Sequence, residues 1–432
     1  MNKKILRLAI PNIISNVTIP LLGIVDLAIL GHLESESYIG AIAIGGMIFN
    51  FLYWGFGFLR MGTTGFTAQS FGNRDLKESL FTLSRAAIVG IGGGLLLIIL
   101  QKPIAVLSFI IIDGSPEVEE LAAQYYYIRI FAAPATLGLY VLTGWFIGMQ
   151  NTKTPMVIAI VVNVLNIVFN VIFVFGFGLK SDGVAYGTLI AQYLGLILGL
   201  YFFIKYYKKL FKYWSKTAVL KLNAFREFFK VNIDIFLRTL CLIFVFSFFT
   251  ASSAKTNDTI LAVNTLLLQF FMFFSFFVDG FAHAAEAMTG KYVGAKNYKG
   301  LSKLIKILFL WGLAIAMLFT LIYFVAGKEL LWLLTDNQNI IDQSTPYFFW
   351  VLLIPLLSFP AFLWDGIYIG AIASKEMRNT MFAATFLVFM PIYLIFHNSL
   401  SNNGLWLALL IFLFSRGIFL TLLAKKAIFR IS

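Results

Sequence analysis

Apolar residues run through this chain in long segments that are separated by short polar stretches. A helix that crosses a bilayer needs about 20 mostly apolar residues, and segments of this kind recur from one end of the chain to the other. We therefore predict an all-α integral membrane protein with twelve transmembrane helices. The predicted spans are residues 5–31, 39–66, 80–101, 122–149, 156–179, 183–204, 228–250, 259–288, 304–327, 347–373, 380–397 and 404–424.

The N-terminal segment resembles a signal peptide, because three basic residues precede an apolar run. The run continues to about Gly31 without a clear small-residue cleavage site. We therefore predict a first transmembrane helix rather than a leader that is removed.

The sequence repeats itself at an offset of about 222 residues. This offset places Tyr125 on Tyr347, Gly144 on Gly366, Gly148 on Gly370 and Lys153 on Lys375. We predict two pseudo-twofold-related six-helix bundles with a central cavity: an N-terminal lobe over 1–204 and a C-terminal lobe over 228–432. A basic cytoplasmic linker, 205–227, joins them. Six helices give both halves the same orientation, an arrangement that suits alternating access.

Composition agrees with a membrane protein, because 60% of the residues are hydrophobic and only 12% are charged. The net charge of +13 follows from topology. With the N-terminus in the cytoplasm, 25 lysines and arginines lie on the cytoplasmic side and four on the opposite side, as the positive-inside rule requires. We expect both termini in the cytoplasm, in the inner membrane of a bacterium. The expected partners are the lipid bilayer and small organic molecules; we expect no nucleic-acid partner and a monomer.

Nine charged residues fall inside the predicted spans, where each costs about 2.5–3.5 kcal/mol at a helix centre. Such residues are expected to face the interior of a bundle and to find partners there. They are Asp26, Arg60, Arg129, Asp234, Arg238, Asp279, Glu286, Asp365 and Arg416.

The second half holds most of these acids. Asp234 and Arg238 are four residues apart on one helix, which predicts a structural ion pair. Asp279, His283 and Glu286 are spaced four and three apart, so they share one helical stripe. Two acids and a histidine on a buried stripe are candidates to carry protons or to hold a cation, or to form a hydrogen-bonded packing network.

Asp365, in "LWDGIYIG", is expected to face one of the acids of that stripe. Two close carboxyl groups cannot both ionise cheaply, so one of them would keep a proton. The chain has no nucleophile–base spacing and no metal-ligand spacing, and "GIGGG" lacks the Lys–Ser or Lys–Thr of a P-loop. We expect no enzyme activity, no metal and no cofactor.

In the first half Asp26 is the only carboxylate in mid-membrane. "NVLNIVFN" supplies Asn163, Asn166 and Asn170, whose amides can hydrogen-bond Asp26 in either protonation state. Pro11 precedes Asp26 on the same helix and permits a bend there. Asp26 is therefore the leading candidate to bind the coupling ion.

Several motifs in order resemble the multidrug and toxic compound extrusion (MATE) family of transporters. They are "VDLAILGHL" in helix one, "AQSFGNRD" after helix two, "GMQNTKTPM" after helix four and "NIVFN…FGFG…GVAYGTLIAQ" across helices five and six. "VDGFAHAAEA" and "WDGIYIGA" resemble the DinF-like branch of that family. The likeness covers nearly the whole chain.

This resemblance implies secondary active export and assigns roles to residues. Asp26 matches the proton-binding aspartate of helix one, and Pro11 the proline at which that helix bends. Asn166 and Thr188 match residues near this site. Asn170 is a departure, because many relatives have Asp at that place.

For the second half the resemblance implies that Asp365 matches an acid involved in coupling in other branches. Asp279 and Glu286 match positions typical of the DinF-like branch, without a defined role. Asp365 is thus a second candidate for ion coupling.

The resulting hypothesis is a proton-coupled antiporter that exports drug-like, cationic amphipathic compounds. Two alternatives stay open: sodium coupling through the second-half acids, and a flippase for lipid-linked precursors. A flippase for large anionic headgroups needs a strongly basic cavity, whereas the spans hold five acids to four arginines.

Overall fold

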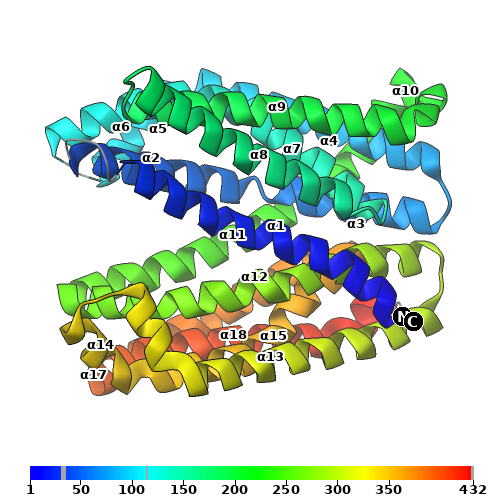
Figure 1. Ribbon diagram of the computed structural model, residues 1–432. Coiled ribbons are helices and arrows are strands. Elements are labelled where there is room, and N and C mark those ends of the chain that lie inside the picture. Colours follow the sequence, from blue (N-terminus) through cyan, green and yellow to red (C-terminus); the bar gives the residue numbers. More distant parts are fainter. Residues whose placement is uncertain (31–35, 113–114, 430–432) are drawn as a thin grey trace. The chain divides into compact units, whose positions relative to one another are not determined.

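A computed structural model describes residues 1–30, 36–112 and 115–429. In these residues every regular element is a helix (Figure 1). Packing divides them into two compact units. The first unit is 14–229, and the second is 1–13 together with 230–432. For a few residues only the backbone is described: Ile19, Leu21, Leu22, Ile24, Asp26, Leu27, Ala28, Leu30 and Glu36.

The N-terminal helix α1 spans Asn2–Leu30 and contributes to both units. The first unit also contains α2 (Glu36–Gly55), α3 (Phe58–Gly72), α4 (Leu76–Ile99), α5 (Gln101–Ile112), α6 (Pro116–Arg129), η1 (Ile130–Ala132), α7 (Ala133–Gly148), α8 (Lys153–Val171), the π-turn η2 (Ile172–Gly176), α9 (Ser181–Tyr207), η3 (Lys208–Tyr213) and α10 (Lys216–Val219).

The second unit is built from longer helices. It contains most of α11 (Leu222–Thr256), then α12 (Asp258–Gly294), α13 (Tyr298–Leu334), α14 (Gln338–Ser344), η4 (Thr345–Tyr347), α15 (Phe348–Ala371), α16 (Ser374–Phe382), the π-turn η5 (Ala383–Phe389), α17 (Met390–Leu400) and α18 (Asn402–Ile428).

Eleven helical segments of the described residues are long and apolar enough to cross a membrane. With α1, which coincides with the first predicted span, each of the twelve predicted spans has its helix. The predicted all-helical membrane fold is confirmed. Helix α5 was not predicted, because its apolar stretch is too short to span a bilayer.

The predicted repeat is visible in the backbone. Arg74 and Lys296, which are 222 residues apart, both adopt the left-handed conformation, with φ of 62° and 52°. The next residues, Asp75 and Asn297, cap α4 and α13: each side chain accepts a hydrogen bond from the amide three residues on, at 3.0 and 2.8 Å. The same turn chemistry therefore starts the same helix in both halves.

Equivalent helix crossings also require glycine at equivalent positions. A Cβ atom on Gly144 of α7 would lie 2.4 Å from the carbonyl oxygen of Arg60 in α3. A Cβ atom on Gly366 of α15 would lie 2.1 Å from the carbonyl oxygen of Ala282 in α12. Both members of each contact are separated by 222 residues, so the crossing is duplicated along with the helices.

The N-terminal residues depart from the predicted lobe 1–204. Residues 1–13 belong to the second unit by their contacts. Gly280 of α12 explains this, because a Cβ atom there would lie 2.3 Å from Ile13 Cγ1 and 3.1 Å from the carbonyl oxygen of Ala9. The missing side chain lets α1 approach the backbone of α12 closely.

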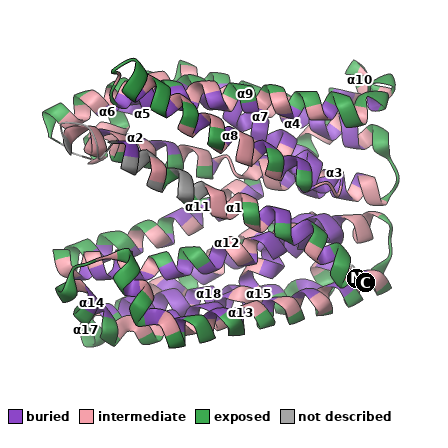
Figure 2. Cartoon of the chain, viewed as in Figure 1, coloured by how far each residue is buried: buried purple, intermediate pink, exposed green. Residues whose placement is uncertain are grey.

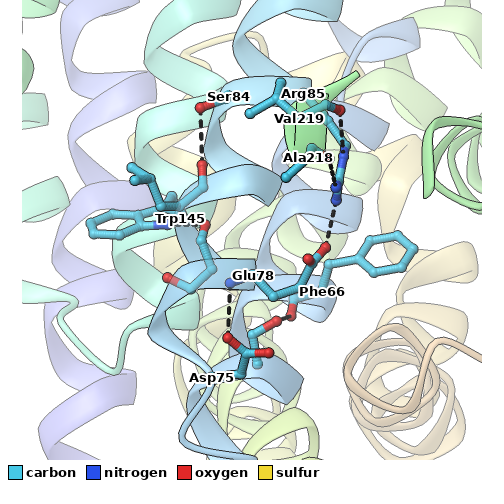
Figure 3. Close-up of polar contacts among 11 residues, drawn as sticks. Phe66, Asp75, Glu78, Ser84, Arg85, Trp145, Ala218 and Val219 are labelled. Atoms are coloured by element: carbon cyan, nitrogen blue, oxygen red, sulfur yellow. Dashed lines mark hydrogen bonds and ion pairs between the residues drawn. The ribbon is translucent and has the colours of Figure 1, made fainter. Parts of the chain in front are cut away.

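The basic segment 205–227, predicted as a linker between lobes, is folded onto the first unit (Figure 3). Arg85 of α4 is buried and donates to the last carbonyls of α10, at 2.9 Å to Ala218 and 3.0 Å to Val219. Its remaining nitrogen pairs with Glu78 at 2.5 Å. A cation at a helix C-terminus is favourable, because the carbonyls there lack partners.

Figure 2 shows how burial is distributed along the helices. Each unit buries its own aromatic core, with Trp145 in the first unit and Trp406 in the second both 0% exposed. Large apolar side chains such as Ile99 and Leu387 are exposed. An apolar exterior of this kind is what a lipid bilayer covers.

Candidate functional site

A chain of buried amides joins α8 and α9 in the first unit. The amide of Asn170 donates to Asn166 Oδ1 at 3.0 Å, and that of Asn166 donates to Thr188 Oγ1 at 2.9 Å. Thr188 in turn donates to the carbonyl of Val184 at 3.0 Å. Gly187 makes room, because a Cβ atom there would lie 2.0 Å from Asn170 Oδ1. The sequence-predicted residues of these two helices thus form one directional network.

Asn163 connects this region to α1. Its amide donates to the carbonyl of Thr18 at 3.3 Å. The backbone of Asp26 lies in α1, but its side chain is outside the described residues, and its role stays a prediction. Pro11 lies within α1, two residues before the point where the contacts of this helix pass from the second unit to the first.

Asp365 of α15 is held by two arginines of other helices. Its Oδ2 accepts from Arg238 of α11 and, at 2.6 Å, from Arg416 of α18. All three residues are buried. Two guanidinium groups on one carboxylate strongly favour its ionised form. The predicted approach to another acid is replaced by a contact to two cations.

The predicted ion pair between Asp234 and Arg238 is wrong. Asp234 accepts instead from Arg378 at 2.6 Å and from Ser374 at 2.9 Å, both in α16. The four-residue spacing does put Asp234 and Arg238 on one face of α11. That face meets two different groups of helices, and each long side chain pairs with an oppositely charged neighbour across the interface.

Helix α12 carries the stripe of Asp279, His283 and Glu286. The helix is continuous over this stretch, so the spacing of four and three does align them. Asp279 and His283 are half-buried, and Glu286 is 1% exposed. Asp279 lies within electrostatic reach of Arg416. The stripe therefore borders the cluster of Asp365 and its two arginines.

Metal chemistry finds no support in the described part of the chain, where no group of three His, Cys, Asp or Glu side chains is placed to hold a metal ion. The two units offer different chemistry. The first has neutral donors and acceptors that can follow a change of protonation, and the second has fixed ion pairs.

Arg129 belongs to a cluster that sequence reasoning missed. It lies over the rings of Phe49 and Tyr125. The signal was available in principle, because Arg129 and Tyr125 are one helical turn apart on α6 and Phe49 is in an aromatic run of α2. Nothing in the sequence tells that α2 and α6 meet.

The comparison with a family model gives the same architecture. The MatE model matches residues 11–172 and 235–395, which is one segment in each half. DNA damage-inducible protein F of Escherichia coli K12 is 36% identical over 98% of this chain and 92% of that protein. The multidrug export protein MepA of Staphylococcus aureus is 22% identical over 95% of this chain and 90% of that protein.

Solved structures share the fold. A crystal structure of MATE in the bent conformation superposes with a TM-score of 0.87 at 19% identity, covering 99% of this chain and 95% of the other. A Vibrio cholerae MATE transporter, VcmN, superposes with a TM-score of 0.86 at 19% identity, covering 98% and 96%. On the family model, the curated relative and the helical repeat together, this multi-pass membrane protein belongs to the MatE family of multidrug and toxic compound extrusion transporters.

Proposed function

We propose that this protein is an antiporter that exports amphipathic, cationic organic compounds in exchange for protons. The family membership supports export, and relatives such as the multidrug export protein MepA support a drug-like substrate. The excess of basic residues on one side supports cytoplasmic termini in a bacterial inner membrane. A proton that enters down about 100 mV supplies about 2.3 kcal/mol, before any pH gradient.

The state of Asp365 carries the choice of protons over sodium. A sodium ion needs several oxygen ligands, and a buried carboxylate that already binds Arg238 and Arg416 is unsuited to a third cation. This leaves the first unit as the seat of coupling. The sodium alternative keeps only Asp279 and Glu286 as acids of the predicted set.

In the proposed cycle Asp26 takes up a proton from the outer side and loses its charge. A neutral Asp26 holds a cationic substrate less tightly, so the substrate leaves. The amide chain of Asn170, Asn166 and Thr188 can exchange donor and acceptor roles as the neighbouring charge changes. Helix one bends near Pro11, where the missing amide leaves a carbonyl without its helical partner.

The test uses purified protein in liposomes that contain a fluorescent lipophilic cation such as ethidium. A proton gradient and a sodium gradient are imposed separately on the wild type and on Asp26→Asn. We expect proton-driven flux in the wild type and a drop of at least tenfold in the variant, with an unchanged unfolding temperature. Asp342→Asn, at an exposed carboxylate of α14, is the matched control and should transport normally.

The opposite outcome is equally clear. Flux that is driven by sodium and survives in Asp26→Asn places coupling at Asp279 and Glu286. It also reduces Asp26 to a packing residue.

A further inference from the structure

Arg129 lies at the end of α6, inside a membrane-spanning segment, and its side chain is half-buried. Its guanidinium carbon lies 4.7 Å from the centre of the Phe49 ring and 5.4 Å from that of Tyr125. One terminal nitrogen donates to the hydroxyl of Tyr125 at 2.5 Å. Rings and a phenol therefore fix the position and the plane of this guanidinium.

No ion pair among the described residues includes Arg129. This contrasts with Arg238 and Arg416, which share a carboxylate. A guanidinium has five N–H donors in a fixed fork, and the hydrogen bond to Tyr125 uses one of them. The cation is thus held in place without neutralisation, and most of its donors are left for another acceptor.

Further hydroxyl groups gather around Arg129. Tyr53 lies within electrostatic reach of Arg129 and beside Thr136. The hydroxyls of Tyr53 and Thr136 are buried, and neither makes a hydrogen bond within the described residues. Tyr140 lies within electrostatic reach of both Arg129 and Arg60. Hydroxyl donors and positive charge converge at one place in the first unit.

We propose that Arg129, Tyr53 and Thr136 form a binding subsite for the acid group of amphipathic aromatic carboxylates. A carboxylate matches the guanidinium fork in charge and geometry. The stacked rings of Phe49 and Tyr53, with centroids 5.6 Å apart, offer an apolar platform for the aromatic body of such a compound. This assignment rests on the proposed export function and adds a second substrate class to it.

The test measures binding to the purified full-length protein in detergent. Two fluorescent probes are compared: dansylglycine, which carries a carboxylate, and dansylglycinamide, which has the same body and no charge. We expect the wild type to bind dansylglycine at least tenfold more tightly. Arg129→Gln should bind both probes equally, because the charged fork is gone.

A matched control removes another cation that lies over aromatic rings. Lys205 lies 5.6 Å from the ring of Tyr201 and 5.7 Å from that of Tyr206, so Lys205→Gln should keep the tenfold preference. Arg129→Lys keeps a charge without the fork and is expected to retain part of the preference; it replaces the Gln variant if that one fails to fold.

Two results overturn the subsite. One is a wild type that binds dansylglycine and dansylglycinamide equally. The other is an Arg129→Gln or Arg129→Lys variant with the full wild-type preference, which would make Arg129 a packing residue. Failure of the export function appears elsewhere, as absent ethidium flux in liposomes, while the preference for the carboxylate in detergent stays measurable.

Discussion

The two units share one backbone plan and differ in their polar residues. In the first unit Asn166 and Thr188 form part of a neutral hydrogen-bonded chain; the residue 222 positions after Asn166 is Val388. In the second unit Asp365 binds Arg238 and Arg416. The residues 222 positions before Asp365 and Arg238 are Thr143 and Asn16, which carry no charge.

This difference separates what duplication preserved from what it did not. Left-handed turns, helix caps and glycine crossings recur at the same offset, because they set the course of the backbone. The buried polar clusters do not recur. The two halves therefore use one scaffold for two purposes: a responsive polar site in the first, and a fixed network of ion pairs in the second.

The largest effect on stability is expected from Asp365→Asn. Loss of the carboxylate leaves Arg238 and Arg416 buried without their counter-charge, which costs about 3–5 kcal/mol of unfolding free energy. Thermal unfolding in detergent measures this, with Asp26→Asn as the comparison in the other unit. If Asp365→Asn unfolds like the wild type but no longer couples transport to an ion, the second unit holds the coupling acid and the contrast fails.

Alanine at the duplicated glycine positions gives the next effect. Gly366→Ala and Gly144→Ala each place a Cβ atom against a backbone carbonyl, at 2.1 and 2.4 Å, and overpacking of this kind costs about 1–3 kcal/mol. In Gly92→Ala the new Cβ meets no atom within 4 Å, so this control should be neutral or stabilising by up to about 1 kcal/mol. Destabilisation at only one of the two crossings contradicts their equivalence.

The smallest effect is expected from Thr188→Val, which removes the acceptor of Asn166. A hydrogen bond of this type contributes about 0.5–1.5 kcal/mol. Thr63→Val is the matched control in the same unit, because its buried hydroxyl makes no hydrogen bond within the described residues. If the amide chain supports the proton site, Thr188→Val also shifts the pH midpoint of ethidium export and Thr63→Val does not. Equal behaviour of both variants argues against such a role.

Sequence reasoning was accurate wherever the signal is local. Each of the twelve predicted spans coincides with helix, and the offset of 222 residues reappears in caps, turns and crossings. It also named Asn166, Asn170 and Thr188, which the structure brings together. It failed for the partners of buried charges: Asp234 pairs with Arg378 rather than with its neighbour on α11.

The sequence by itself determined the helices, their duplication and their membrane character, because apolar segment length, helical spacing and turn residues act over a few positions. Only the tertiary structure decided which helix each polar face meets. Spacing assigns a residue to a face of its own helix, but a long arginine reaches the acid or ring that packing brings to it. The pairs of Asp365 and the ring contacts of Arg129 are set by that packing, and so they had no signature along the chain.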